Sequence, residues 1–159
     1  MASRRSDKRQ TMDGAEFPLA ESSGFLVRDA NRAFQRLLEK RIAPYGIARG
    51  QWYFLRVLWN EDGLSQRELS ARVGTMEPTT VIALRSMEKV GLVRRVRSAD
   101  DRRRSQVWLT PKAQRLRDEL LALARGITDE AEDGIAREEL ATFRRIIARM
   151  TANLDRIKA

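Results

Sequence analysis

The sequence predicts a mainly α-helical protein with one small β-hairpin. Through most of residues 22–157, apolar residues recur at the spacing of amphipathic helices. Only residues 93–109 differ, because two short apolar runs there flank a long charged middle, which is typical of a hairpin with a polar tip. Two short helices separated by Gly74 precede this hairpin. That order of elements is a winged helix-turn-helix.

Two helices are expected before the helix-turn-helix, at about residues 22–42 and 49–61, with a break at residues 43–46. Their apolar stripes are Leu26, Ala30, Phe34, Leu37 and Leu38 in the first helix, and Trp52, Phe54, Leu55, Leu58 and Trp59 in the second.

The helix-turn-helix is marked by its helix ends. Ser65 and Glu68 have the spacing of a capping box at the start of the first short helix, and Gly74 ends that helix. Pro78 fits the first turn of the second helix, and Gly91 can adopt the left-handed conformation that ends it. The expected buried face of this second helix is Val81, Leu84, Met87 and Val90.

The middle of the hairpin is strongly basic. Six arginines lie there, relieved only by Asp100 and Asp101: Arg94, Arg95, Arg97, Arg102, Arg103 and Arg104. A hairpin that projects arginines suits a groove lined with phosphates. The alternative is a solvated basic loop without a partner, since charge runs often have none. The helix-turn-helix in front of the hairpin favours the nucleic-acid interpretation.

After the hairpin, Thr110 and Pro111 predict the start of a helix that continues through residue 131 to a break near Gly134. The last helix has the a/d spacing of a heptad seam, formed by Leu140, Phe143, Ile147, Met150, Leu154 and Ile157. Such a seam needs a partner, either the first helix of the same chain or a second copy. We expect a dimer interface, because the two terminal helices flank the central module and cannot easily both bury their stripes on it.

These elements predict four parts in the 159-residue chain. Residues 1–21 are expected to be a disordered basic tail, and residues 22–48 an N-terminal dimerisation helix. Residues 49–110 are expected to form the winged helix-turn-helix lobe, and residues 111–159 the C-terminal dimerisation helices.

Composition favours a nucleic-acid partner over catalysis. The net charge is +9 and the isoelectric point about 10.9, which attracts nucleic acid or an anionic membrane surface. The chain has no cysteine, which excludes thiol chemistry and zinc–thiolate sites. It also has no histidine, the commonest general base. We therefore expect no enzyme activity, metal or cofactor. No apolar run is long enough to span a membrane and no apolar segment follows the basic start, which predicts a cytoplasmic protein.

Four segments resemble the MarR family of bacterial transcription regulators. Residues 64–70 (LSQRELS) are similar to the family's helix motif tq-x-eLA, and residues 87–95 (MEKVGLVRR) to LE-x-x-GLV-x-R. Residues 101–103 (DRR) resemble the wing signature D-x-R, and residues 107–110 (VWLT) the v-x-LT that follows it. The order and spacing of all four make the match specific, and the likeness extends from about residue 22 to residue 157.

The resemblance implies a bacterial, nucleoid-associated homodimer whose two lobes straddle a palindromic operator in double-stranded DNA. It implies that the helix from Glu77 reads the major groove, that Arg103 enters the minor groove, and that Asp101 orients the wing through an ion pair. Relatives often carry arginine and aspartate where this chain has Ile82 and Arg85. The resemblance therefore implies no particular operator sequence.

We expect two kinds of DNA contact. Phosphate contacts are expected from Ser65, Gln66, Arg97, Arg102, Arg103 and Arg104, and base contacts from Glu77, Thr79, Thr80 and Arg85. Two of these residues have a second interpretation: Glu77 can complement the helix dipole instead, and Arg85 can lie over a phosphate.

The family also implies an effector pocket where the dimerisation helices meet the lobe. Tyr45, Trp52 and Arg56 lie in or near that region and would suit an aromatic carboxylate or its thioester, because the rings can stack and the guanidinium can hold a carboxylate. The alternative is that Trp52 belongs to the core with Leu55 and Trp59.

The function expected from the sequence is that of a repressor released from its operator by such a ligand. The alternative is a non-specific nucleic-acid-binding or nucleoid-type protein without a small-molecule effector. A regulator should prefer its operator over scrambled DNA by about a thousandfold or more, and a non-specific binder should not.

Overall fold

The computed structural model describes residues 18–97 and 105–157, which fall in two units, residues 1–33 and 34–159. The basic tail and the tip of the hairpin, with Asp101, Arg102, Arg103 and Arg104, lie outside the described residues. In the first unit, a short 3₁₀ turn, η1 (Leu19–Glu21), precedes the start of helix α1 (Ser23–Ile42). There the Ser22 hydroxyl accepts the Phe25 N–H at 3.3 Å.

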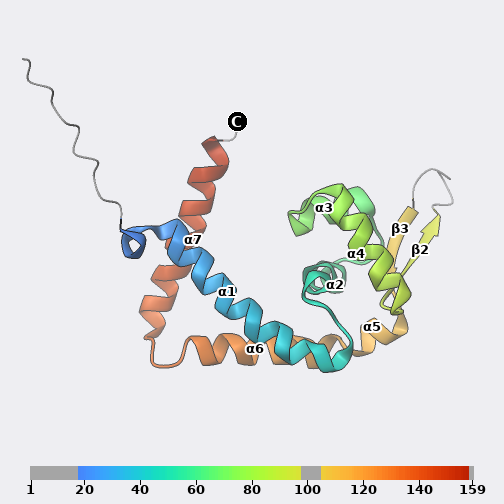
Figure 1. Cartoon of the computed structure of the whole chain (residues 1–159), viewed down its shortest axis with the longest axis horizontal. Helices are drawn as coiled ribbons and strands as arrows, with labels where there is room; N and C mark the ends of the chain where they lie inside the picture. The colour runs from blue at the N-terminus through green and yellow to red at the C-terminus, as the bar shows by residue number, and fades with distance from the viewer. Residues whose placement is uncertain (1–17, 98–104, 158–159) are drawn as a thin grey trace, which may run out of the picture. The chain divides into compact units, whose positions relative to one another are not determined.

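The second unit contains the end of α1 and all the remaining elements (Figure 1). In chain order these are η2 (Ala43–Tyr45), α2 (Arg49–Asn60), β1 (Leu64–Ser65), α3 (Gln66–Val73), α4 (Glu77–Lys89), β2 (Val93–Arg97), β3 (Ser105–Leu109), α5 (Pro111–Arg115), α6 (Arg117–Ala131) and α7 (Arg137–Ile157). The predicted class, mainly α with a small β-hairpin, is confirmed. Among the described residues, no helix combines the length and apolar character that a membrane crossing requires.

The predicted helix ends are confirmed in detail. Glu68 Oε2 accepts the Ser65 N–H at 2.8 Å, and the Glu68 N–H is 3.3 Å from Ser65 Oγ, so both bonds of the capping box are present. Gly74 and Gly91 have φ of 72° and 71°. These are left-handed values that favour glycine, and they stop α3 and α4 where the sequence predicts.

The sheet has one strand more than the predicted hairpin. β3 pairs antiparallel with both β2 and β1, which gives the order β1-β3-β2. Val93 lies opposite Leu109 and Arg97 opposite Ser105, while Leu64 of β1 lies opposite Val107. β1 has only two residues. A strand this short shows no alternation of apolar and polar positions, so its sequence carries no strand signal.

One apolar core lies in the second unit, and α2, α3, α4 and the sheet contribute to it together with α1, α5 and α6. Its fully buried side chains include Ile42, Leu55, Leu58, Leu69, Leu84, Met87, Leu92, Val107 and Leu120. The predicted inner face of α4 wrongly included Val90 and omitted Thr80. Val90 is 38% exposed, because α4 ends before it, and Thr80 is buried instead.

The helix predicted to run unbroken from residue 111 to residue 131 is divided at Leu116. Leu116 has φ −78° and ψ −11°, its N–H still bonds to the Lys112 carbonyl at 3.3 Å, and its carbonyl accepts the Leu120 N–H at 3.0 Å, so the interruption between α5 and α6 is confined to this one residue. The predicted break after α6 is present at Gly134, with φ of 75°.

Candidate nucleic-acid interface

The turn between α3 and α4 is held by a buried serine. The Ser70 hydroxyl donates to the Thr75 carbonyl at 2.7 Å, and the Thr75 N–H returns to the Ser70 carbonyl at 3.1 Å. The side chain of Ser70 is nearly inaccessible, at 3% exposure. These two bonds satisfy buried backbone groups and fix the direction in which α4 leaves the turn.

α4 is also bonded directly to α2. The Gln51 amide donates from Nε2 to the Ser86 hydroxyl at 2.9 Å, while Gln51 Oε1 accepts the Ala48 N–H at 3.0 Å. Gln51 is buried, and these two hydrogen bonds satisfy both ends of its amide within the protein. α4 therefore has a defined position relative to α2, and this sets where the residues of its outer face lie.

The outer face of α4 carries most of the predicted base-contact residues. Glu77, Thr79 and Arg85 are exposed, as is Ile82. Thr80 corrects the prediction, because its side chain is fully buried and its hydroxyl lies 3.3 Å from the Met76 carbonyl. Thr80 lies one turn before buried Leu84, on the core side of the helix, and so cannot contact a base edge.

An ion pair joins the hairpin to α4. Arg95 on β2 lies 2.9 Å from the Glu88 carboxylate, and the two side chains are 28% and 33% exposed. Arg95 Nε is buried and has no hydrogen-bond partner among the described residues. The neighbouring arginines of β2, Arg94 and Arg97, are exposed. β2 therefore carries one arginine, Arg95, that anchors it to α4, and two arginines that are exposed to solvent.

A second set of contacts fixes the base of the hairpin to the end of α2. Asp62 accepts the Leu109 N–H at 2.9 Å and the N–H of its neighbour Gly63 at 3.0 Å. Gly63 has a φ of 74°, and a Cβ at this position would lie 2.5 Å from the Trp108 ring. Only glycine fits here, because the backbone is left-handed and an indole covers it.

The start of α3 holds the two predicted phosphate-binding residues Ser65 and Gln66, both half-buried. The Ser65 hydroxyl also donates to Glu68 at 2.6 Å, so it is engaged in the helix cap. Of the hairpin residues predicted to bind DNA, the described part of the chain includes only Arg97, at the end of β2. The others lie in the part of the hairpin outside the described residues, and so does the predicted wing-orienting Asp101.

The three residues predicted for an effector pocket have separate roles. Trp52 is a core residue, 4% exposed, with its ring 5.9 Å from that of Trp59 at an edge-on angle of 78°. The Arg56 guanidinium lies 5.9 Å from the Trp52 ring, in a cation–π contact. The Tyr45 hydroxyl donates to Glu119 at 2.6 Å, and this hydrogen bond raises the pKa of Tyr45.

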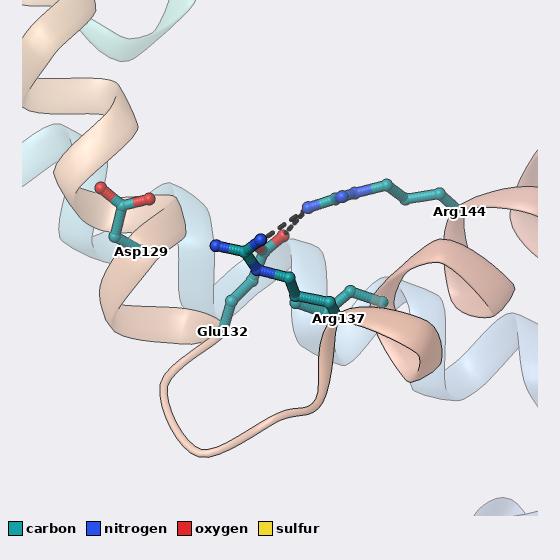
Figure 2. Close-up of a pocket in the computed structure, with 5 residues that line it drawn as sticks. Asp129, Glu132, Arg137 and Arg144 are labelled. Atoms are coloured by element: carbon teal, nitrogen blue, oxygen red, sulfur yellow. Dashed lines mark hydrogen bonds and ion pairs between the residues drawn. The ribbon is translucent and has the colours of Figure 1, made fainter.

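A hollow of about 440 Å³ lies elsewhere, at the corner between α6 and α7 (Figure 2). Figure 2 shows Arg144 reaching from α7 to Glu132, with Arg137 beside this pair. The Arg144–Glu132 bonds measure 2.7 and 2.9 Å. The lining residues are Asp129, Glu132, Arg137, Leu140 and Arg144. None of the three residues predicted to bind an effector belongs to this hollow.

Sequence reasoning missed the residues that position the interface. Gln51 and Ser86 lie 35 residues apart in the chain. Asp62 and Leu109 are separated by 47. Neither pair follows a local pattern. Glu88 and Arg95 stand seven positions apart within the segment that resembles LE-x-x-GLV-x-R, and opposite charges at both ends of that motif were a usable signal.

Comparison with known proteins agrees with this geometry. The sequence pattern of the MarR family matches residues 45–104. A MarR transcriptional regulator from Methanosarcina mazei Go1 is similar at 29% identity and a TM-score of 0.78, over 84% of this chain and 96% of that one. The transcriptional regulator PA3341 is similar at 34% identity and a TM-score of 0.74, over 84% of this chain and 98% of that one.

Two further solved structures share the fold at lower identity. One is CouR from Rhodococcus jostii RHA1 bound to p-coumaroyl-CoA, at 21% identity and a TM-score of 0.73 over 85% of this chain and 95% of that one. The other is reduced AbfR bound to DNA, at 20% identity and a TM-score of 0.74 over 89% of this chain and 95% of that one. From the matched segment, the winged helix-turn-helix and the near-complete coverage of its relatives, it follows that the chain belongs to the MarR family of transcriptional regulators.

Proposed function

We propose that the chain is a dimeric repressor that binds a palindromic operator through α4 and the arginine-bearing hairpin, and that a small aromatic anion releases it. The observation that carries this proposal is the two-sided character of α4. Thr80, Leu84 and Met87 on its inner face are fully buried, while Thr79, Ile82 and Arg85 on its outer face are exposed. A helix held this firmly can present its outer face to the major groove.

The hairpin would supply phosphate contacts beside α4. Arg94 and Arg97 are exposed on β2, and the sequence places three more arginines, residues 102–104, in the tip. Arg95 holds the strand to α4 through Glu88, so arginines and helix would approach the duplex as one unit. AbfR, which shares the fold, has been solved bound to DNA, and this supports the same use of the fold here.

α7 would supply the dimer interface. The helix has 21 residues and none of them is buried. On the predicted heptad seam, Phe143, Leu154 and Ile157 are 59%, 61% and 80% exposed, and Leu140, Ile147 and Met150 are half-buried. A stripe of this kind on a monomeric protein would leave apolar surface in water. A second copy of α7 would cover it.

The proposed effector is an aromatic carboxylate or its thioester. CouR is solved with p-coumaroyl-CoA, which belongs to this class, and Arg56 offers an exposed guanidinium over the Trp52 ring. Because Trp52 itself is buried in the core, the ligand would meet Arg56 and the surface around it and would not stack on that indole. Release requires that the ligand bind the DNA-competent and incompetent shapes with different affinity.

Titration of the purified chain with DNA tests the operator claim. Fragments selected from a random pool should bind about a thousandfold more tightly than scrambled fragments of the same composition. Equal affinity for the two would instead support a non-specific nucleoid-type protein. A panel of aromatic carboxylates and their thioesters, added to a fluorescent operator complex, tests the effector. Displacement by a member of the panel is expected, and no response from any compound would refute this part.

A further inference from the structure

Ile82 places an apolar side chain in the middle of the face that the proposed function turns toward DNA. It is 69% exposed, although Thr80 and Leu84, two positions before and after it, are fully buried. Each residue turns an α-helix by about 100°, so a residue halfway between two buried neighbours four apart lies on the opposite side. Ile82 therefore faces directly away from the core.

The exposed helix neighbours of Ile82 include polar residues and one proline. Thr79 and Arg85, three positions to either side, are exposed and lie on the same face, as does the exposed Pro78 four positions before. Ser86, four positions later, is also exposed, but its hydroxyl accepts a hydrogen bond from Gln51. A single exposed isoleucine is ordinary on a protein surface. Its position matters here, because it occupies the centre of a rigid helix face whose neighbours can bond to phosphates and base edges.

An isoleucine cannot take part in hydrogen-bond readout, since its side chain has no donor or acceptor. It can gain only by removing apolar surface from water. In the major groove, the apolar group on a base edge is the 5-methyl of thymine. The other base edges present donors and acceptors, which Ile82 would desolvate without replacing their hydrogen bonds.

We infer that Ile82 is a specificity-determining residue that packs against the 5-methyl group of a thymine in each operator half-site. The inference rests on the proposed function, since it assumes that α4 lies in the major groove. It goes further by naming a chemical feature of the DNA sequence. Thr79 and Arg85 would contact the neighbouring positions and set the register of Ile82.

Replacement of thymine by deoxyuridine tests this directly, because deoxyuridine keeps the base pair and removes only the methyl group. The operator is first selected from a random pool with the full chain, and each thymine is then replaced in turn. At one position of each half-site, replacement should weaken binding about fourfold, and at both half-sites together about sixteenfold, the value of burying one methyl group per site.

Variants locate the effect on Ile82. Ile82→Ala should bind thymine and deoxyuridine operators equally well, with its thermal unfolding unchanged because the side chain is exposed. Ile135→Ala is the matched control, since Ile135 is also exposed, at 45%, but lies between α6 and α7, outside the lobe. This control should keep the fourfold discrimination.

The possible outcomes distinguish failure of the proposed operator binding from failure of the proposed role of Ile82. If selection recovers no preferred sequence, the proposed operator-binding function is wrong. If a preferred sequence is recovered and no single deoxyuridine weakens binding by the wild-type chain, the operator stands and the role of Ile82 is wrong. The same conclusion holds if Ile82→Ala retains the full preference for thymine.

Discussion

At the residue scale, the base of the hairpin depends on Gly63. Alanine at this position would need a left-handed backbone at φ 74° and would place its Cβ 2.5 Å from the Trp108 ring. The backbone cost is about 1–2 kcal/mol, and displacing a packed ring adds about 1–3 kcal/mol. Gly63→Ala should therefore lower the free energy of unfolding by about 2–5 kcal/mol, measured by urea denaturation at fixed protein concentration.

Gly74→Ala is the control for this prediction. Gly74 has nearly the same φ, 72°, but a Cβ there meets nothing within 4 Å. Its substitution should cost only the backbone part, about 1–2 kcal/mol. Equal losses in the two variants would show that the contact with Trp108 contributes nothing.

The Arg95–Glu88 ion pair gives a second prediction at this scale. Arg95→Ala removes a half-buried partner and leaves the Glu88 carboxylate unpaired, which should cost about 1–2 kcal/mol of unfolding free energy. DNA binding should weaken as well, because β2 loses its bond to α4. Arg72→Ala breaks a more exposed pair with Glu61, with side chains 44% and 50% exposed, and should cost less than about 0.5 kcal/mol. A reversed order of these losses would contradict this assignment.

At the element scale, the hairpin should contribute to DNA binding through charge. Arg103→Ala should weaken operator binding by about 1–3 kcal/mol while the dimer stays folded, as expected for an arginine in the minor groove. Gel-shift titration measures the loss, and light scattering checks the dimer. Unchanged affinity would remove the wing from the mechanism.

The elements also show which features a sequence can predict. The ends of α3 and α4 were predictable because glycine, proline and a capping box act within a few residues. The residues on the inner face of α4 were less predictable. Thr80 and Val81 are both compatible with the helical period, and only the packing against the core decides that Thr80 is buried.

Contacts between distant elements could not be predicted at all. The Gln51–Ser86 bond and the Asp62–Leu109 bond depend on how α2, α4 and β3 meet in space. The placement of Trp52 in the core was one of two interpretations that the sequence left open. Its 4% exposure and its edge-on contact with Trp59 favour the core interpretation.

At the scale of the whole molecule, two lobes should act together on one operator. If each lobe neutralises about four phosphates, a dimer neutralises about eight, and the log–log dependence of affinity on salt should have a slope near −7. Titrations at several salt concentrations give this slope. A slope of about half that value would indicate that a single lobe binds.

The α7 seam should be required for the two lobes to bind one operator together. Phe143→Glu would place a charge within the proposed interface, near the start of α7, where burying it without a partner is costly, and should produce monomers. The monomer should bind the operator with about half the salt slope. Phe143→Leu keeps the seam apolar and should remain a dimer. If Phe143→Glu also remains a dimer, the interface lies elsewhere.

The measurement that tests the central claim most directly is the molar mass of the wild-type chain in solution, by sedimentation equilibrium at cellular ionic strength. A twofold regulator built on α7 predicts twice the chain mass of 18.3 kDa. A mass of 18.3 kDa at every protein concentration would contradict it, because one lobe cannot span a palindromic site.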